Sequence, residues 1–225
     1  MKTKQYYVDN LNVLYEDNHL IVIEKPINVL SQKDETNDID INEIVKEYLK
    51  VKYNKLGNVY LGLVHRLDRR VGGVLVLAKT SKAAARLSDS IRNNNMEKYY
   101  IAKVEGIIEA DGNINVLIKK DEKNRKAIIS KEGKESKLEY KVLGYDKNNT
   151  FVFVNLITGR YNQIRVSFSH IGHPIINDYK YGNGKVNNDQ LGLWCYKIVI
   201  EHPVLKEKKE FISLPNGEIW NGLNI

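Results

Sequence analysis

Tyr60-Leu-Gly-Leu-Val-His-Arg-Leu-Asp-Arg-Arg-Val-Gly-Gly-Val-Leu-Val-Leu-Ala78 is the stretch that decides the fold. Its two apolar runs, residues 60–64 and 74–78, are short, bounded by glycine and rich in Val and Leu, which predicts two buried strands. Between them, one carboxylate, Asp68, lies among three arginines. Burying an ionised aspartate is unfavourable unless it is paired, so this spacing indicates a carboxylate held by an arginine. A turn-capping aspartate beside solvated arginines explains the same residues, because structural ion pairs also gather charge.

The composition is that of an ordinary globular protein with a basic surface. The 225 residues are 42% hydrophobic and 28% charged, and the net charge is +7. A surface of that sign attracts phosphate polymers and acidic membranes. The single cysteine, Cys195, excludes an intramolecular disulfide and a cysteine-pair metal site. No stretch is apolar for long enough to cross a bilayer, so we expect no membrane insertion and a cytoplasmic location.

Local patterns along the chain predict strands in runs with a few helices. Two β-prone runs around Glu16-Asp17-Asn18 predict a hairpin over residues 11–25. Apolar residues at helical spacing predict a surface helix after Asp38, Asp40 and Asn42, and another from Thr80 or Ser81 to Ile91. Further strands are expected at residues 99–104, 113–118, 137–144, 151–157, 191–200 and 210–214. The sum is an α+β arrangement with a mostly antiparallel sheet.

Three other segments lie outside this regular pattern. The basic run Lys119–Lys126 is expected to be an exposed loop, solvated or able to grip a phosphate backbone. Thr158-Gly159-Arg160 is expected to open a helix, and a helix start beside Arg160 and Arg165 suits a phosphate or a carboxylate. Residues 172–184 hold several glycines and a proline, which predicts a shaped loop.

Three polar and aromatic segments, taken in order, resemble the RluA family of RNA pseudouridine synthases. Residues 65–68 are similar to that family's H-R-L-D signature. Residues 98–106, Lys-Tyr-Tyr-Ile-Ala-Lys-Val-Glu-Gly, are similar to its K-x-Y-x-A-x-V-x-G strand, and residues 159–165, Gly-Arg-Tyr-Asn-Gln-Ile-Arg, to its G-R-x-H-Q-I-R motif. The resemblance implies Asp68 as the catalytic residue, Tyr100 as the active-site tyrosine and Arg165 as the arginine that pairs with Asp68. It also implies contacts to substrate or RNA for His65, Arg66, Arg69, Arg160 and Gln163.

The resemblance covers nearly the whole chain and implies the family's architecture. That architecture is a mixed, mostly antiparallel central β-sheet with flanking helices and a catalytic cleft across the sheet. We expect one catalytic domain over residues 1–225, either undivided or as two lobes sharing one sheet, without the S4-type RNA-binding domain that many members carry. The departures from the family pattern bear on the fit of the substrate and fall at Val71, Gly72, Asn162, Ser167 and Asn177.

The reaction implied by the resemblance suits a single carboxylate. Turning uridine into pseudouridine breaks an N-glycosidic bond, turns the base and rejoins it through carbon, without water, metal or organic cofactor. A glycosidase needs two carboxylates, whereas these motifs offer Asp68. An arginine partner lowers the pKa of an aspartate below its usual value of about 3.9 and keeps it ionised for nucleophilic attack. Tyr100 offers an aromatic face for a base taken out of its stack.

Most of these residues also have a structural interpretation. Tyr100 fits a strand core and Arg165 a surface helix, while Arg69 and Arg70 fit solvated charge. The histidines at positions 65, 170 and 173 lack a metal-ligand spacing and fit structural roles. Cys195 lies in an apolar strand and fits the core.

The sequence therefore predicts an isomerase that acts, as a monomer, on a uridine in ribosomal or transfer RNA. Two other classes of protein compete with it. One is a synthase-derived protein that binds RNA without modifying it, for example during ribosome assembly. The other is a nucleoside-processing enzyme acting on small molecules, which the net charge of +7 disfavours.

Overall fold

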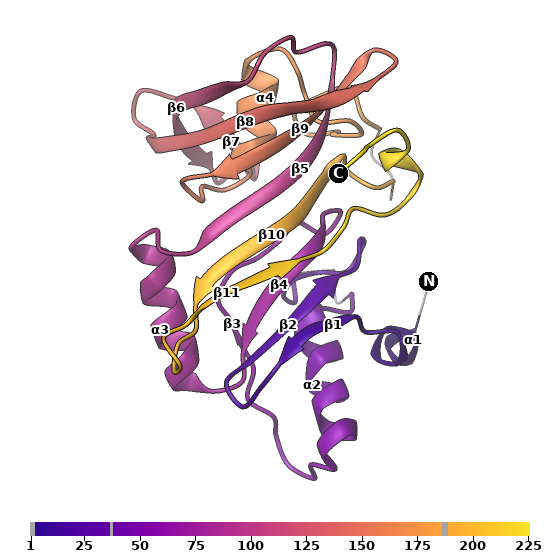
Figure 1. Cartoon of the computed structure of the whole chain (residues 1–225), viewed down its shortest axis with the longest axis vertical. Coiled ribbons are helices and arrows are strands. Elements are labelled where there is room, and N and C mark those ends of the chain that lie inside the picture. Colours follow the sequence, from indigo (N-terminus) through magenta and orange to yellow (C-terminus); the bar gives the residue numbers. More distant parts are fainter. Residues whose placement is uncertain (1–2, 37, 186–188) are drawn as a thin grey trace. The chain divides into compact units, whose positions relative to one another are not determined.

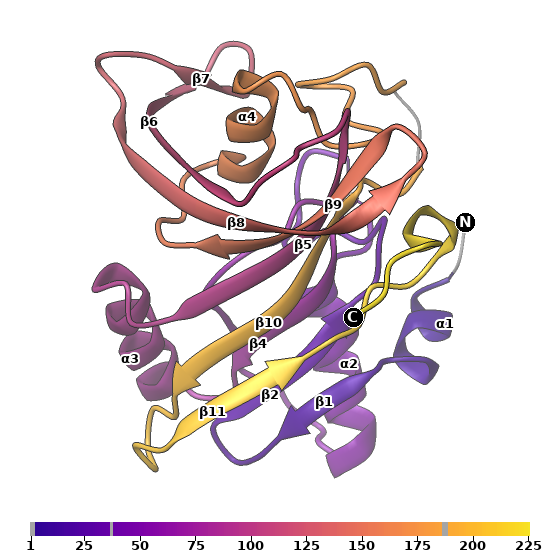
Figure 2. The same ribbon diagram turned by 45° about the horizontal axis from the view of Figure 1, so that its top comes forward.

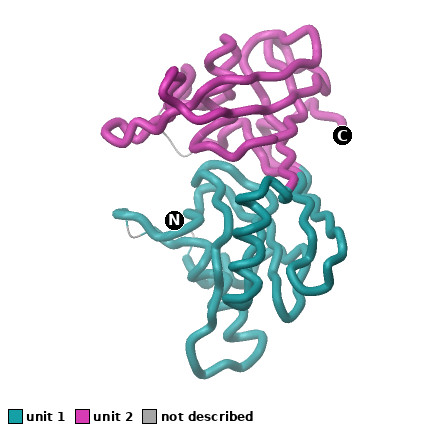
Figure 3. The backbone as a smooth tube through the Cα atoms, turned by 90° about the vertical axis from the view of Figure 1, so that its left-hand side faces the viewer, with its two compact units in different colours: residues 1–96, 197–214 teal, residues 97–196, 215–225 magenta. Residues whose placement is uncertain are grey.

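The computed structural model describes residues 3–36, 38–185 and 189–225. The chain forms two compact units, shown in different colours in Figure 3. Unit 1 consists of Met1–Met96 and Lys197–Leu214, and unit 2 of Glu97–Tyr196 and Pro215–Ile225. Strand β10 (Leu193–Glu201) carries the chain from unit 2 back into unit 1. The expectation of one catalytic domain over the whole chain stays a prediction.

Unit 1 is built on antiparallel strands whose apolar runs are buried. Strand β2 pairs with β1 and with β4, in a register that runs from Leu20 opposite Ala78 to Lys25 opposite Gly73. Residues 20–23 and 74–78 are 0% exposed, so both faces of these strands are covered, as their unbroken apolar sequence predicts. The elements of unit 1 in Figure 1 are α1 (Lys4–Asp9), β1 (Val13–Glu16), β2 (Leu20–Lys25), α2 (Ile41–Tyr53), β3 (Gly62–Leu63), β4 (Gly72–Ala78), α3 (Ser81–Arg92) and β11 (Lys208–Ile212), which pairs with β10.

The hairpin and both helices predicted for this part of the chain are present. Asp17 Oδ1 accepts the backbone N–H of His19 and of Leu20, each at 2.7 Å, and so shapes the turn between β1 and β2. Helix α2 is capped by Asp40, whose Oδ1 accepts the N–H of Glu43 at 2.9 Å. Helix α3 is capped by the Thr80 hydroxyl.

Two local features of unit 1 differ from the sequence prediction. The short helix α1, capped by Thr3, precedes the expected hairpin. The strand predicted over residues 60–64 is reduced to β3, and Tyr60 is 49% exposed. Both differences involve short segments whose structure depends on packing, since a single helical turn has little intrinsic stability.

Unit 2 is an antiparallel sheet in the strand order β5-β9-β8-β6-β7. Helix α4 packs against the β6–β7 hairpin, where Val166 contacts Ile118 and Ala127 (Figure 2). The α+β class with mostly antiparallel strands is confirmed, while the catalytic cleft across the sheet stays a prediction. The elements of unit 2 are β5 (Glu97–Glu105), β6 (Gly112–Asp121), β7 (Lys126–Ile129), β8 (Lys134–Asp146), β9 (Asn149–Leu156), α4 (Gln163–His170) and the 3-10 helix η1 (Glu218–Trp220).

Two predictions for unit 2 are wrong in part. The basic run Lys119–Lys126 is exposed for most of its length, but it forms the end of β6 and a tight turn into β7, with Asp121 opposite Lys126. The helix expected to open at Thr158 begins at Gln163. Asn162, the residue before it, has φ +49°, a left-handed conformation that ends the preceding turn. The first segment is organised by hairpin pairing with the next strand, and the second by hydrogen bonds to Lys137.

None of the helices in the described part of the chain is long and apolar enough to cross a membrane.

Candidate active site

The turn that carries Asp68 is held by a buried serine from a distant segment. Ser31 Oγ donates to the carbonyl of Leu67 at 2.6 Å and accepts the N–H of Leu67 at 3.0 Å. The N–H of Val71 closes the turn on the carbonyl of Asp68 at 3.0 Å. Ser31 and Leu67 are buried, whereas Asp68 is half-buried. Asp68 therefore lies on a backbone that is fixed on both sides.

A buried cation, Lys25, lies behind the same turn. Its Nζ donates to the carbonyls of Pro26 at 2.8 Å, Val29 at 2.7 Å and Arg69 at 3.3 Å, and the residue is 0% exposed. Three acceptors match the three N–H groups of an ammonium ion. Burial lowers the pKa of Lys25 to about 7, and the negative charge of Asp68 opposes that shift. Lys25 is therefore a neighbour of Asp68 within unit 1 that the three motifs do not include. In the sequence it is the lysine that ends an apolar run.

The arginines that follow Asp68 are engaged inside unit 1. Arg69 Nη1 forms an ion pair with Asp38 at 2.6 Å. Arg70 is only 9% exposed. The interpretation of these two residues as solvated charge is therefore wrong, because the turn folds them back onto the protein. A contact between Arg69 and RNA stays a prediction.

The two residues at the start of the H-R-L-D signature have different surroundings. His65 Nε2 accepts the N–H of Val76 at 3.0 Å, which ties the beginning of the turn to β4. Arg66 is exposed, as a residue that contacts RNA must be. The proposed RNA contacts of both side chains stay predictions.

Tyr100, on β5 in unit 2, is 7% exposed and shares a hydrogen bond with the Cys195 thiol. Cys195 is buried, as expected for a core residue, and burial raises its pKa to about 12. Lys98 lies two residues before Tyr100, and burial lowers its pKa. A Cβ at Gly159 would lie 3.1 Å from Lys98 Nζ, so the glycine leaves room for this ammonium group. Tyr100 therefore lies in the core of unit 2, beside the buried Cys195 thiol.

Arg165 is held by a buried carboxylate, Asp178. Arg165 Nε donates to Asp178 Oδ2 and Nη2 to Oδ1, both at 2.7 Å. Asp178 is 0% exposed, and its Oδ1 also accepts the N–H of Lys180 at 2.9 Å and of Tyr181 at 3.2 Å. The Tyr181 ring lies 5.2 Å from the guanidinium carbon. The bidentate pair fixes the orientation of Arg165, so the surface-helix interpretation is wrong, while the predicted pairing with Asp68 stays a prediction.

The loop before α4 is held by the amide of Gln163. Its Oε1 accepts the Thr158 hydroxyl and the N–H of Arg160, each at 2.9 Å, and its Nε2 donates to the carbonyl of Lys137 at 3.0 Å. Gln163 is 2% exposed, so a direct contact with RNA would require these bonds to break. Arg160 is exposed, and its Nε donates to the carbonyl of Glu135 at 2.9 Å. Sequence reasoning missed the structural role of Gln163, since its partners lie up to 26 residues away.

The predicted catalytic residues come from both units: Asp68 from unit 1, and Tyr100 and Arg165 from unit 2. Within residues 3–36, 38–185 and 189–225, no three His, Cys, Asp or Glu side chains are arranged to hold a metal ion. His173 Nδ1 lies 2.8 Å from the carbonyl of Glu105, a structural contact.

Comparison with known proteins places this chain among RNA-modifying enzymes. A family model described as RNA pseudouridylate synthase matches residues 19–170. Ribosomal large subunit pseudouridine synthase C of Buchnera aphidicola subsp. Schizaphis graminum is 35% identical, over 97% of this chain and 72% of its own length. An uncharacterized RNA pseudouridine synthase of Aquifex aeolicus is 36% identical, over 85% of this chain and 64% of its own length.

A solved structure has the same fold. Human RNA pseudouridylate synthase domain containing 4 superposes with a TM-score of 0.78, covering 94% of this chain and 92% of that chain at 22% sequence identity.

Proposed function

This chain belongs to the RNA pseudouridylate synthase family, a family of isomerases, and we propose that it converts uridine to pseudouridine in ribosomal RNA with Asp68 as the nucleophile. The observation that carries the residue assignment is the setting of Asp68: a half-buried residue on a turn fixed by Ser31, with the Lys25 side chain behind it. A nucleophile needs an accessible oxygen, a fixed position and a retained negative charge. Asp68 lies on a turn of fixed position, and the charge of Lys25 lies behind that turn.

In the proposed reaction the Asp68 carboxylate attacks the sugar at C1′ and the bond from C1′ to N1 of the base breaks. The base turns, and a bond forms between C1′ and C5 as the bond from C1′ to the Asp68 oxygen breaks, which regenerates the carboxylate. The proton at C5 then leaves and N1 takes up a proton. Atoms and electrons balance without water or a redox partner. We assign Tyr100 the aromatic face against the base, and Arg165, oriented by Asp178, the charge that keeps Asp68 ionised.

The substrate class rests on the relatives. Several are named for the large ribosomal subunit, including synthase D of Vibrio cholerae, which is 31% identical. We therefore place ribosomal RNA before transfer RNA. We further propose that the chain acts as a monomer in the cytoplasm. Sedimentation of the purified protein with and without RNA would test the monomeric state.

The test measures release of tritium from ribosomal RNA labelled at C5 of uracil, because the C5 proton leaves when the new bond forms. The wild-type chain should release tritium, and Asp68→Asn should lower the rate at least about a thousandfold, since the amide keeps the shape and loses the charge. RNA affinity, measured by fluorescence anisotropy, should change by less than about threefold.

The matched control is Asp89→Asn, an exposed aspartate on α3 that pairs with Arg92 at 2.8 Å. This variant should release tritium at the wild-type rate. Normal tritium release by Asp68→Asn would refute the assignment of the nucleophile. RNA binding without any release by the wild type would favour the non-catalytic RNA-binding protein instead.

A further inference from the structure

An exposed tyrosine in unit 2 is surrounded by basic side chains. Tyr161 is 37% exposed, and the ammonium groups of Lys120 and Lys180 lie 5.4 and 5.8 Å from the centre of its ring. The Tyr161 hydroxyl donates to the carbonyl of Arg125 at 3.1 Å, and Lys180 Nζ donates to the same carbonyl at 2.9 Å. We call Lys120, Arg125, Lys126, Tyr161 and Lys180 the Tyr161 cluster. It joins the turn of the β6–β7 hairpin to the loops on both sides of α4.

Hydrogen bonds within unit 2 hold the cluster together. The hydroxyl of Tyr181 accepts the N–H of Ala127 at 2.6 Å and the side-chain amide of Asn162 at 3.1 Å, so the hairpin is tied to the start of α4. Lys126 Nζ lies 6.0 Å from the same Tyr181 ring. These bonds fix the position of the Tyr161 backbone relative to the lysines. A rigid aromatic ring between cations loses little conformational entropy when a ligand binds.

The charge of this region is strongly positive. Residues 119–126 contain five basic and two acidic side chains. Lys120 pairs with Glu122 at 2.6 Å, but both groups are solvent-exposed and such pairs are weak. The hydrogen bond of Lys180 Nζ goes to a neutral backbone carbonyl, that of Arg125.

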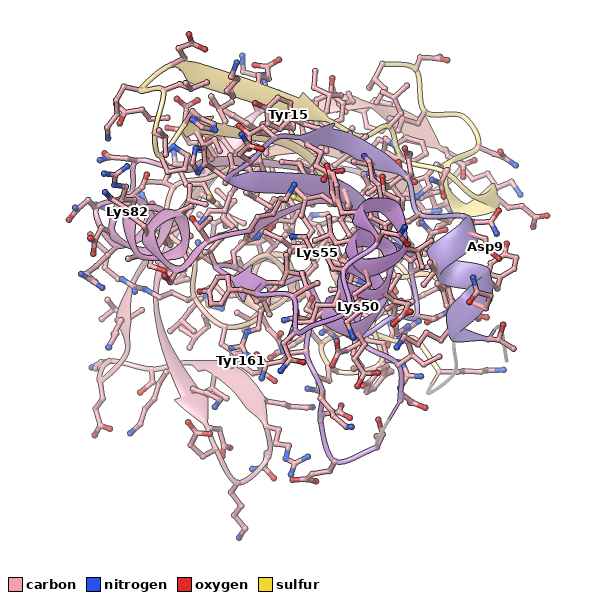
Figure 4. All side chains as sticks on the ribbon, turned by 90° about the horizontal axis from the view of Figure 1, so that it is seen from below. Asp9, Tyr15, Lys50, Lys55, Lys82 and Tyr161 are labelled. Carbon is pink, nitrogen blue, oxygen red and sulfur yellow. The ribbon has the colours of Figure 1, made fainter. Side chains whose placement is uncertain are left out.

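A second tyrosine among lysines, in unit 1, shows the contrasting arrangement. Tyr53 has Lys52, Lys55 and Lys79 at 5.6, 5.6 and 5.0 Å from its ring. There the carboxylate of Glu16 pairs with Lys52 and Lys79 and accepts the Tyr53 hydroxyl, each at 2.7 Å. An internal anion therefore already satisfies the Tyr53 group, whereas a neutral carbonyl occupies that place beside Tyr161. Tyr161 and Lys55 are both labelled in Figure 4.

We propose that the Tyr161 cluster is a binding site for single-stranded RNA, in which an unpaired base stacks on Tyr161 while Lys120 and Lys180 contact its flanking phosphates. The proposal rests on the proposed function and deepens it by assigning a contact away from the nucleophile. Aromatic rings and basic side chains side by side are the means by which proteins hold unpaired nucleotides. The lysine stems are flexible, so an ammonium group can move from the ring to a phosphate as the base enters. An acidic protein surface would form ion pairs with the lysines but would not need the Tyr161 ring for stacking.

The experiment compares two probes on the full chain by fluorescence anisotropy: a labelled uridine oligomer of about ten nucleotides, and an abasic phosphodiester of equal length. Tyr161→Leu should weaken binding of the oligouridine about tenfold and leave binding of the abasic probe within about twofold. Tyr161→Phe, which keeps the ring and loses the hydroxyl, should bind both probes like the wild type. Lys120→Ala with Lys180→Ala should weaken both probes and reduce the salt dependence of binding by about 1.4 in the log–log slope.

Tyr53→Leu is the matched control and should leave both affinities within about twofold. Equal weakening of both probes by Tyr161→Leu, or a Tyr161→Phe variant as weak as Tyr161→Leu, would overturn the stacking role. Polyglutamate that competes as well as oligouridine would assign the cluster to an acidic protein surface instead. Tritium release at saturating RNA keeps the two proposals separate. Tyr161→Leu should raise KM and leave kcat unchanged, whereas Asp68→Asn abolishes release.

Discussion

Asp178 and Asp68 both lie in turns, one in each unit, and their surroundings differ. Asp178 is 0% exposed, and its carboxylate accepts four hydrogen bonds, two from Arg165 and one each from the N–H groups of Lys180 and Tyr181. Asp68 is half-buried on a turn that is held by backbone contacts. A carboxylate whose lone pairs are occupied can orient its neighbours but cannot attack a substrate. The comparison therefore supports a positioning role for Asp178, while the nucleophilic role of Asp68 stays a prediction.

The cations near the two carboxylates also differ, because one contacts its carboxylate directly and the other acts at a distance. Arg165 contacts Asp178 directly through two nitrogen atoms, a geometry that fixes both side chains. Lys25 donates to three backbone carbonyls and affects Asp68 through the electric field of its charge. Asp178 thus holds its cation by direct hydrogen bonds, whereas the charge of Lys25 acts on Asp68 from behind the backbone of the turn. Three predictions test this contrast.

The largest expected effect on stability comes from Asp178→Asn. The change leaves the Arg165 guanidinium buried without its carboxylate, and breaking such a pair lowers the free energy of unfolding by about 3–5 kcal/mol. Asp68→Asn should change it by less than about 1 kcal/mol, because that side chain is partly solvated. Urea unfolding followed by circular dichroism measures both.

A double variant keeps this test decisive if Asp178→Asn fails to fold. Arg165→Met with Asp178→Leu removes both charges and should recover much of the lost stability, because apolar residues can replace a buried ion pair. Equal stability losses for Asp68→Asn and Asp178→Asn would mean that both carboxylates are structural.

The next effect is a pH dependence caused by Lys25. Its folded-state pKa of about 7 lies below the usual 10.5. Between these two pH values the unfolded chain therefore binds a proton that the folded chain releases, and stability rises with pH. Relative to Lys25→Met, the wild type should gain up to about 1.4 kcal/mol of unfolding free energy for each pH unit above 7. Urea titrations of both proteins at pH 7, 8 and 9 measure the difference.

Comparison with Lys25→Met cancels the contributions of other groups, including Lys98, whose pKa is also lowered by burial. A difference between the two proteins that stays constant with pH would show that the three carbonyls keep Lys25 protonated throughout this range.

Ser31→Ala should have a smaller effect on stability than Asp178→Asn. The change removes both hydrogen bonds that hold Leu67 and leaves a buried N–H and carbonyl without that partner, which should cost about 1–3 kcal/mol of stability. Tritium release should slow about tenfold through a lower kcat, since the Asp68 turn loosens while Asp68 itself remains. Ser31→Thr, which keeps the hydroxyl, should recover most of the rate. An unchanged kcat for Ser31→Ala would show that the turn is held without this serine.

Much of the fold followed from local patterns. Asp40 and Thr80 cap helices where the sequence placed them, because a capping bond joins residues three apart and depends little on the rest of the chain. Strands β2 and β4 followed from unbroken apolar runs. The prediction was partly wrong for residues 119–126, because they form a hairpin with the next strand. It was also partly wrong for residues 158–162, because the Gln163 side chain ties this segment to the carbonyl of Lys137. Composition alone contains no information about such partners.

The sequence by itself determined the family, the α+β class and the carboxylate, Asp68, on which the chemistry is expected to depend. The tertiary structure decided which groups surround that carboxylate's turn and which cation pairs with Asp178. Ser31 reaches Leu67 across 36 residues, and Lys25 reaches Arg69 across 44. Hydrogen bonds and burial over such separations arise only when strands and loops pack together, because local periodicity specifies which face of an element is apolar but not which residue meets it.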